Sequence, residues 1–313
     1  MRRVLAVPLG FAAILLFASF QPPNRPTTQS QSSQIRVEVL EVNVLVTVVD
    51  KHGRFVTDLQ PDRFSLEEDN VPQTITTFVR ETSLPLSVAM MIDTSGSVRL
   101  KLEFEKRAVS SFLHQVMRPE DQAMLVEFDT GATLLRDFTN RPSDLANELK
   151  GLRAGGGTAL FDALYRVANE KMGGASPRRV IVIVSDGDDL HSKRPLEEAV
   201  EMVQRAEATV YAVGTSKFGA GRNEDGDKVL KAVTEQTGGT VFFPYSEQQF
   251  EDAFSVINDE LRSQYSLTYI PTNKKKDGVF RKIKVKLKDD KGLSSRYKKG
   301  YYPPAEDTKG KSE

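Results

Sequence analysis

The chain lacks cysteine and has little histidine. Without cysteine it has no disulfide, no thiolate metal ligand and no cysteine nucleophile. The three histidines, His52, His114 and His191, are not spaced as metal ligands, and no serine is arranged around them as a nucleophile. We therefore expect these histidines to be structural or exposed.

Net charge is also absent. The 43 basic residues balance the 43 acidic ones, so no overall field draws the molecule onto nucleic acid or an anionic membrane. We expect no nucleic-acid partner. Four lysines at alternate positions of one predicted strand could still bind a polyanion. Such lysines more often keep one face of a strand solvated and discourage aggregation. The series consists of Lys282, Lys284, Lys286 and Lys288.

The N-terminus predicts export. Arg2 and Arg3 precede an apolar run from Val4 to Phe20, so residues 1–20 are typical of a signal peptide, with an uncleaved anchor as the alternative. Residues 21–34, rich in Gln, Ser, Thr and Pro, predict a disordered linker. We expect a periplasmic, cell-surface or secreted protein that contacts a membrane only through a retained N-terminal segment.

Alternating apolar residues predict strands at both ends of the remaining chain. These strands are expected over residues 40–48, 63–66, 73–79, 265–269 and 283–287. Because lone hairpins are marginally stable in water, residues 35–82 and 263–303 are expected to pair in one small β-sandwich. Residues 304–313 would be a disordered tail.

The middle of the chain, residues 83–262, alternates buried strands with helices, which predicts a doubly wound, Rossmann-like α/β domain inserted into the sandwich. Strands are expected at 85–93, 123–128, 134–138, 180–185, 209–213 and 240–243, and helices at 98–116, 144–152, 159–171, 196–206, 228–236 and 247–264. The sheet should be mostly parallel. The short link Thr130-Gly131 suits a hairpin and hence one antiparallel edge strand.

Oxygen-bearing side chains follow two of these strands and one glycine-rich loop. Asp93, Ser95 and Ser97 lie where the first buried strand ends, Thr158 follows Gly155-Gly156-Gly157, and Asp186 follows the strand that ends at Ser185. Ligands in parallel sheets collect outside the carboxyl ends of the strands. The three loops are therefore expected to converge at one face.

This set resembles the metal-ion-dependent adhesion site of von Willebrand factor type A domains and integrin I domains. The match consists of Asp-x-Ser-x-Ser at residues 93–97 with Thr158 and Asp186 downstream. The resemblance covers roughly residues 85–260, and the flanking strands are similar to those of bacterial proteins related to that family. It implies that the serines bind a metal directly, that the aspartates act largely through water, and that Thr158 coordinates when a ligand is bound.

Hydroxyl and carboxylate oxygens suit a hard cation such as Mg²⁺, or Mn²⁺. We expect a non-enzymatic binding module whose cation captures an Asp or Glu side chain of a protein partner. A metal-assisted hydrolase is the alternative, although the motif loops contain no base for it. A purely structural subunit is disfavoured because the five residues have no packing role.

Three other patterns have simpler interpretations. Asp93-Thr94-Ser95 is similar to the Asp-Thr-Gly of aspartic proteases, but no second such tripeptide exists. The loop before Thr158 lacks the lysine of a phosphate-binding loop. Its glycines are better explained as letting the backbone come close to a metal ion. Asp188 and Asp189 could extend the ion site, although an acidic turn after a strand is more often simply solvated.

The last helix of the α/β domain has one apolar stripe, formed by Phe250, Phe254, Ile257 and Leu261. In the integrin I domains that this region resembles, movement of the corresponding helix accompanies a change of metal-site affinity. Coupling of the site to the β-sandwich is therefore one hypothesis, and a fixed core helix is the other.

Overall fold

The computed structural model describes residues 40–80, 84–175, 178–215, 223–290 and 292–305. The predicted signal segment and linker, and the predicted tail beyond Ala305, lie outside these residues. Within the described ranges, no helix has the length and apolar character needed to cross a membrane.

A six-stranded sheet forms the centre of the α/β part, in the order β10-β9-β8-β5-β6-β7. Its strands are β5 (Leu86–Asp93), β6 (Gln122–Phe128), β7 (Ala132–Thr139), β8 (Arg178–Ser185), β9 (Ala208–Gly214) and β10 (Val241–Phe242). All neighbours pair in parallel except β6 and β7, which are antiparallel. The predicted mostly parallel sheet with one antiparallel edge strand is confirmed.

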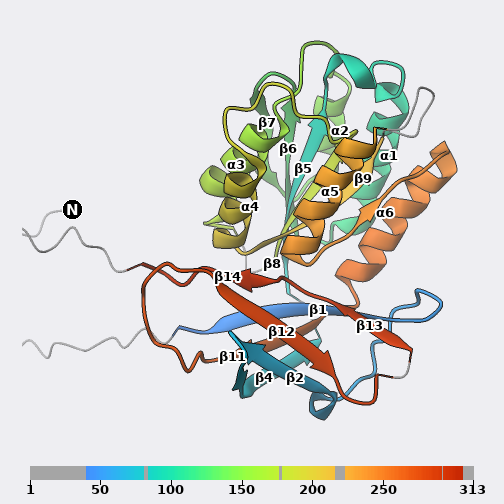
Figure 1. Cartoon of the computed structure of the whole chain (residues 1–313). Coiled ribbons are helices and arrows are strands. Elements are labelled where there is room, and N and C mark those ends of the chain that lie inside the picture. Colours follow the sequence, from blue (N-terminus) through green and yellow to red (C-terminus); the bar gives the residue numbers. More distant parts are fainter. Residues whose placement is uncertain (1–39, 81–83, 176–177, 216–222, 291, 306–313) are drawn as a thin grey trace, which may run out of the picture. The chain divides into compact units, whose positions relative to one another are not determined.

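Helices cover both faces of this sheet (Figure 1). One apolar core contains α1 (Leu102–Val116), α2 (Pro142–Leu149) and α6 (Glu247–Leu261). The other contains α3 (Leu160–Val167), α4 (Leu196–Arg205) and α5 (Glu224–Thr237). Every residue of β5 is buried between them, as expected for a strand of a doubly wound sheet.

Helix ends differ from the sequence prediction at several places: α2 ends at Leu149 instead of 152, and α5 begins at Glu224 instead of 228. The first helix begins at Leu102 because Gly96–Val98 forms a 3₁₀ turn, in which the amide of Val98 donates to the carbonyl of Ser95. The third helix ends at Val167 and continues as a single π turn over Ala168–Met172. The last helix ends at Leu261 instead of continuing to Gln264.

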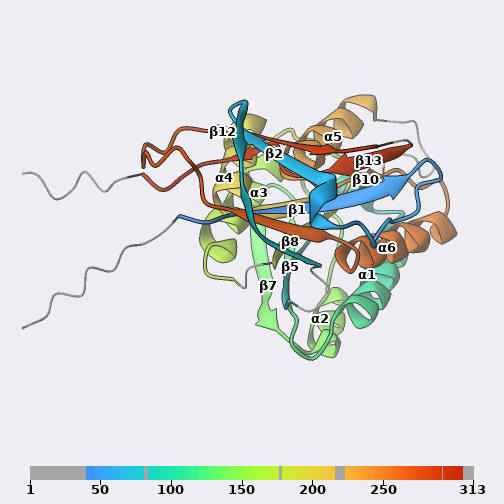
Figure 2. The same ribbon diagram turned by 90° about the horizontal axis from the view of Figure 1, so that it is seen from below.

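Two four-stranded sheets combine segments from both ends of the described chain (Figure 2). Their orders are β13-β1-β11-β4 and β14-β12-β2-β3. The strands are β1 (Val42–Asp50), β2 (Phe64–Glu68), β3 (Val71–Gln73), β4 (Ile75–Arg80), β11 (Tyr265–Tyr269), β12 (Arg281–Leu287), β13 (Leu293–Arg296) and β14 (Gly300–Tyr301). Side chains of both sheets share one apolar core.

One predicted strand is divided. The segment expected as a single strand over 73–79 breaks at Thr74: β3 pairs with β2, and β4 pairs with β11 in the other sheet. The β2–β3 hairpin turns at Asp69 and Asn70, whose φ angles are 48° and 66°. Asp and Asn tolerate this left-handed conformation better than most residues, which accounts for the tight turn.

The chain leaves and re-enters these sheets at neighbouring positions. In the antiparallel β4–β11 pair, Arg80 lies opposite Tyr265. The residues that precede and follow the α/β part are therefore neighbours in one strand pair.

Candidate functional site

Asp93 ends β5 at the sheet edge where β8 also ends. The two strands pair in parallel up to Ile92 and Val184. Asp93 is fully buried, and its carboxylate accepts hydrogen bonds from the amide of Ser95 at 2.8 Å and the hydroxyl of Ser185 at 2.7 Å. Asp93 is therefore fixed by neighbouring chain segments.

Three oxygens from two loops lie close together beside it. The hydroxyls of Ser95 and Ser97 are 3.0 Å apart, and the Ser97 hydroxyl donates to Asp186 Oδ2 at 2.7 Å. Ser95 and Asp186 are buried, whereas Ser97 is exposed. The contact between Ser97 and Asp186 joins residues that are 89 positions apart in sequence.

The glycine-rich loop brings Thr158 to the same face through backbone contacts. The amide of Gly96 donates to the carbonyl of Gly156 at 3.2 Å, and the amide of Gly155 donates to the carbonyl of Thr94 at 2.7 Å. Gly156 has a φ of +77°, a conformation that favours glycine. The loop glycines permit close backbone approach, and Thr158 itself is 4% exposed.

His191 joins this face, which the sequence did not predict. Its Nδ1 accepts a hydrogen bond from the amide of Thr158 at 3.3 Å, and the amides of Leu190 and His191 donate to the carbonyl of Thr158. The ring also fills the space beside Gly157, where an added Cβ would lie 2.1 Å from Cε1. No sequence pattern links Gly157 to His191, so their contact could not be predicted before the fold was known.

Asp188 and Asp189 bind chain segments around the site, although they were expected to be solvated. A side-chain oxygen of Asp189 accepts from the amide of Phe161 at 3.3 Å and from the hydroxyl of Ser192 at 2.7 Å. Asp188 accepts from the side-chain amide of Asn223, the residue that caps α5. Both aspartates thus hold the loop after β8 against neighbouring helices.

Burial dominates the electrostatics of the site. It raises the pKa of Asp93 to about 6, against hydrogen bonds from Ser185 and Ser95 that lower it. On α1, burial also raises the pKa of Glu105 to about 8, and the negative charge of Asp93 adds to this effect. These raised pKa values mean that burial disfavours the charged forms of both carboxyls, and a nearby cation would favour them.

The donor set fits a hard divalent cation. Oxygens placed octahedrally about 2.1 Å from Mg²⁺ lie about 3.0 Å from their neighbours, and the two contacts of Ser97 are 3.0 and 2.7 Å long. Across the described ranges, no group of three or more His, Asp or Glu side chains could hold a metal ion. An ion at this face would depend on hydroxyl oxygens.

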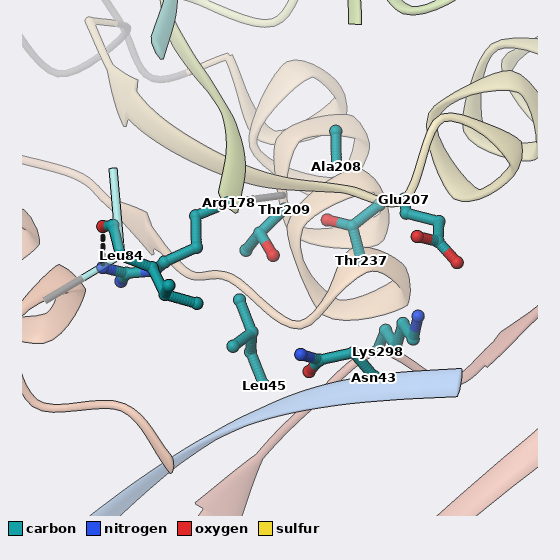
Figure 3. A pocket seen from close by; sticks show the side chains of 9 residues that line it. All are labelled: Asn43, Leu45, Leu84, Arg178, Glu207, Ala208, Thr209, Thr237 and Lys298. Carbon is teal, nitrogen blue, oxygen red and sulfur yellow. Dashed lines mark hydrogen bonds between the residues drawn. The ribbon is translucent and has the colours of Figure 1, made fainter. Parts of the chain in front are cut away.

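A separate cavity of about 40 Å³ lies at the opposite end of β8 (Figure 3). Arg178 and Leu84 line one side, and Lys298 and Glu207 lie on the other. Its remaining lining residues are Asn43, Leu45, Ala208, Thr209 and Thr237. Since one water molecule needs about 10–15 Å³, the cavity has room for a few waters and is too small for a metabolite.

Comparison with known proteins agrees with this fold. Residues 88–188 match the family model of the von Willebrand factor type A domain. This segment runs from β5 to the loop after β8 and contains all five predicted site residues. The chain therefore has a von Willebrand factor type A-like α/β fold. No curated protein matches the sequence.

Solved structures show the same fold at low identity. Proximal thread matrix protein 1 of the mussel byssus is 14% identical, with a TM-score of 0.51 over 62% of this chain and 51% of that one. In another structure of that protein, 15% identical with a TM-score of 0.50 over 61% of this chain and 50% of that one, zinc occupies its metal-ion-dependent adhesion site. A von Willebrand factor type A protein from Catenulispora acidiphila is 14% identical, with a TM-score of 0.49 over 88% of this chain and 76% of that one.

The PilB minor pilin of Streptococcus sanguinis is also similar, at 14% identity and a TM-score of 0.47. That match covers 57% of this chain and 62% of the pilin. This chain thus spans less than two thirds of the pilin and about half of the mussel protein.

Proposed function

We propose that Asp93, Ser95, Ser97, Thr158 and Asp186 hold Mg²⁺ or Mn²⁺ and that the chain is a cation-dependent binding module. When bound, the ion supplies a coordination position for an Asp or Glu side chain of a protein partner. The serine and threonine hydroxyls are neutral, so the chain leaves part of the ion's charge for the partner to neutralise. We propose a binding role and no enzymatic one.

The contact between Ser97 and Asp186 is the observation that supports this proposal most strongly. It places a hydroxyl and a carboxylate oxygen from two distant loops 2.7 Å apart. An exposed serine beside a buried carboxylate has no evident value for packing, whereas both oxygens suit a cation. The zinc-occupied site of the mussel protein adds support by analogy.

The hydrolase alternative requires a base. His191 is the titratable ring that lies against the Thr158 loop, and its Nδ1 already accepts a hydrogen bond from the backbone. This contact favours a role in holding the loop over proton transfer.

The predicted export is part of the same proposal. Residues 1–20 would direct the chain out of the cytoplasm, and residues 21–34 would tether it. The two four-stranded sheets would form one β-sandwich, from residues 35–82 and 263–303, into which the domain over 83–262 is inserted. The opposed positions of Arg80 and Tyr265 support this arrangement.

Calorimetric titration with Mg²⁺ and Mn²⁺ tests the cation site. Asp93→Asn is the suitable variant because Asp93 is fully buried and asparagine keeps its shape. We expect at least a tenfold loss of affinity, which is about 1.4 kcal/mol. Ser97→Ala, at an exposed position, should weaken binding without changing the unfolding temperature.

The matched control is Asp137→Asn on edge strand β7, where the carboxylate is exposed and paired with Lys171. It should bind the ions as the original chain does. Equal affinity for all four proteins would remove the five residues from the proposal. Ion-dependent hydrolysis of a peptide or phosphate ester would overturn the binding role in favour of the hydrolase.

A further inference from the structure

Glu105 is a buried acid on the helix that follows the proposed cation site. It lies three residues after Leu102 and four before Val109, so it shares the face of α1 that packs into the core. It is fully buried. Neither of its carboxylate oxygens has a hydrogen-bond partner within the part of the chain that the structure describes.

A series of contacts places the start of α1 beside the cation site. Lys101, one turn before Glu105, donates its Nζ to the carbonyl of Thr215 at 2.6 Å. The amide of Thr215 donates to the carbonyl of Ser185 at 3.0 Å, and the hydroxyl of Ser185 donates to Asp93 at 2.7 Å. Glu105 therefore follows, by one helical turn, a residue that this series links to Asp93, and its carboxyl lies close enough to Asp93 and Asp186 to interact with their charges.

A buried, unsatisfied carboxyl is costly and requires a physical reason. The hydroxyl of Thr215 is likewise buried and without a partner among the described residues. The charged groups that act on Glu105 are Asp93 from β5, Lys101 from the start of α1, and Asp186 from the loop after β8. Two negative neighbours and one positive neighbour leave the region in need of positive charge.

We propose that Glu105 is a sixth residue of the cation site, a buried carboxylate behind the five loop residues that strengthens cation binding by its charge without ligating the ion. This inference rests on the function proposed above. Lys101 alone does not balance three carboxylates, and a divalent cation beside Asp93 and Asp186 does. Glu105 would thus act on the ion through its negative charge, whereas the five loop residues supply the coordinating oxygens.

The protonation of Glu105 gives a specific signature. Burial, the charge of Asp93 and the charge of Asp186 raise its pKa to about 8, with Lys101 acting in the opposite direction. At pH 7.5, below this pKa, Glu105 is protonated in most but not all molecules of the ion-free protein. Cation binding favours the carboxylate, and the displaced proton passes to the buffer.

The test compares the full chain with Glu105→Gln by titration with Mn²⁺ at pH 7.5, in two buffers of different ionisation enthalpy. The original chain should release a fraction of a proton per ion, and the variant should release none. The affinity of the variant should be about tenfold lower at pH 8.5. This difference should largely disappear at pH 6, where Glu105 is neutral in the ion-free protein.

Glu103→Gln is the matched control, because Glu103 lies on the same helix with its side chain 75% exposed and paired with Lys106. It should retain both the proton release and the affinity. A purely structural Glu105 would leave the proton release and the pH dependence unchanged on substitution, and that result overturns the inference.

Unfolding in chelator provides a measurement without the ion. Because the pKa of Glu105 is raised from 4.5 to about 8 by folding, its contribution to stability is full below about pH 4.5 and is lost as the pH rises toward 8. Glu105→Gln should therefore gain stability relative to the original chain over this range. An equal pH dependence in both proteins contradicts the buried-charge assignment.

The outcomes separate this inference from the proposed function. If the original chain binds neither Mg²⁺ nor Mn²⁺, both fail. If it binds an ion but Glu105→Gln leaves the proton release unchanged, this inference alone is overturned.

Discussion

At the residue scale, Gly157 and His191 show how two unremarkable residues acquire a role at the site. The ring occupies the space that a side chain at 157 would need, and its Nδ1 accepts from the amide of Thr158. Gly157 is thus needed for space and not for its backbone angle, since no positive φ is found there.

We predict that Gly157→Ala weakens ion binding roughly fivefold, or about 1 kcal/mol, because it displaces the ring and breaks one hydrogen bond to the Thr158 loop. His191→Ala should have a similar effect. In the His191→Ala background, adding Gly157→Ala should cost little more, because no ring remains to collide with the new methyl group. Calorimetry on the four proteins of this cycle measures the coupling, and fully additive losses would contradict the steric explanation.

The sequence singled out the five loop residues because their types and order are local properties, and the structure brings their loops together at the edge of the sheet where β5 and β8 end. It did not predict His191 or Glu105 as parts of this region. Glu105 did leave a signal, since it interrupts an apolar stripe at helical spacing. His191 left none, because its contact with Gly157 depends on how two loops pack.

At the scale of elements, α6 connects the α/β part to one of the two smaller sheets, the one that contains β1 and β13. Its Phe250 and Phe254 rings pack against Phe104 and Phe112 of α1. At its other end, the buried Glu260 accepts from Thr47 of β1 at 2.9 Å and from Arg296 of β13 at 2.6 Å. The predicted apolar stripe is confirmed, but this polar end was not predicted.

We predict that Arg296→Ala destabilises the chain by about 2–3 kcal/mol, because it leaves the Glu260 carboxylate buried with only neutral donors. Adding Glu260→Gln should recover part of the loss, since the amide carries no charge. Arg141→Ala, which breaks an exposed pair with Asp144, is the control and should cost under about 1 kcal/mol. Urea unfolding measures the free energy of unfolding of all three variants. Equal losses of stability for Arg296→Ala and Arg141→Ala would show that the pair with the buried Glu260 stabilises the chain no more than an exposed pair does.

Coupling between α6 and the cation site remains a prediction. The helix contacts α1, which begins beside the site, and it also contacts β9. Because the chain has no native cysteine, a cysteine pair between the last turn of α6 and β9 can lock the helix unambiguously. If the helix has two packings, affinity for a carboxylate-bearing peptide should differ about tenfold between the oxidised and reduced states. Identical affinities, with the disulfide confirmed, would identify α6 as a fixed core helix.

At the scale of the whole described chain, the sequence predicted the buried strands of the central sheet more accurately than the short strands of the two smaller sheets. β5, β8 and β9 of the central sheet are mainly apolar and fully or almost fully buried, and the strands of this sheet were located to within about two residues. The shorter strands were harder: β13 has one apolar residue in Leu293–Arg296, and β14 consists of Gly300 and Tyr301 alone. Their positions depend on pairing partners that are distant in sequence, which local periodicity cannot report.

The pairing of distant segments leads to a prediction about truncation. In a chain that ends at Gln264, β1 loses both of its neighbours, β11 and β13, and β4 loses β11. β2 keeps only the short β3, because its other neighbour is β12. A lone two-stranded hairpin is marginally stable in water, so residues 40–80 should be cleaved rapidly by trypsin, while residues 84–264 should stay protected by their own two cores. The full chain should resist cleavage in both regions, and mass spectrometry of the fragments distinguishes them. If residues 40–80 of the truncated chain resist trypsin as well as they do in the full chain, these strands are stable without their C-terminal partners, and the two ends of the chain do not fold as one unit.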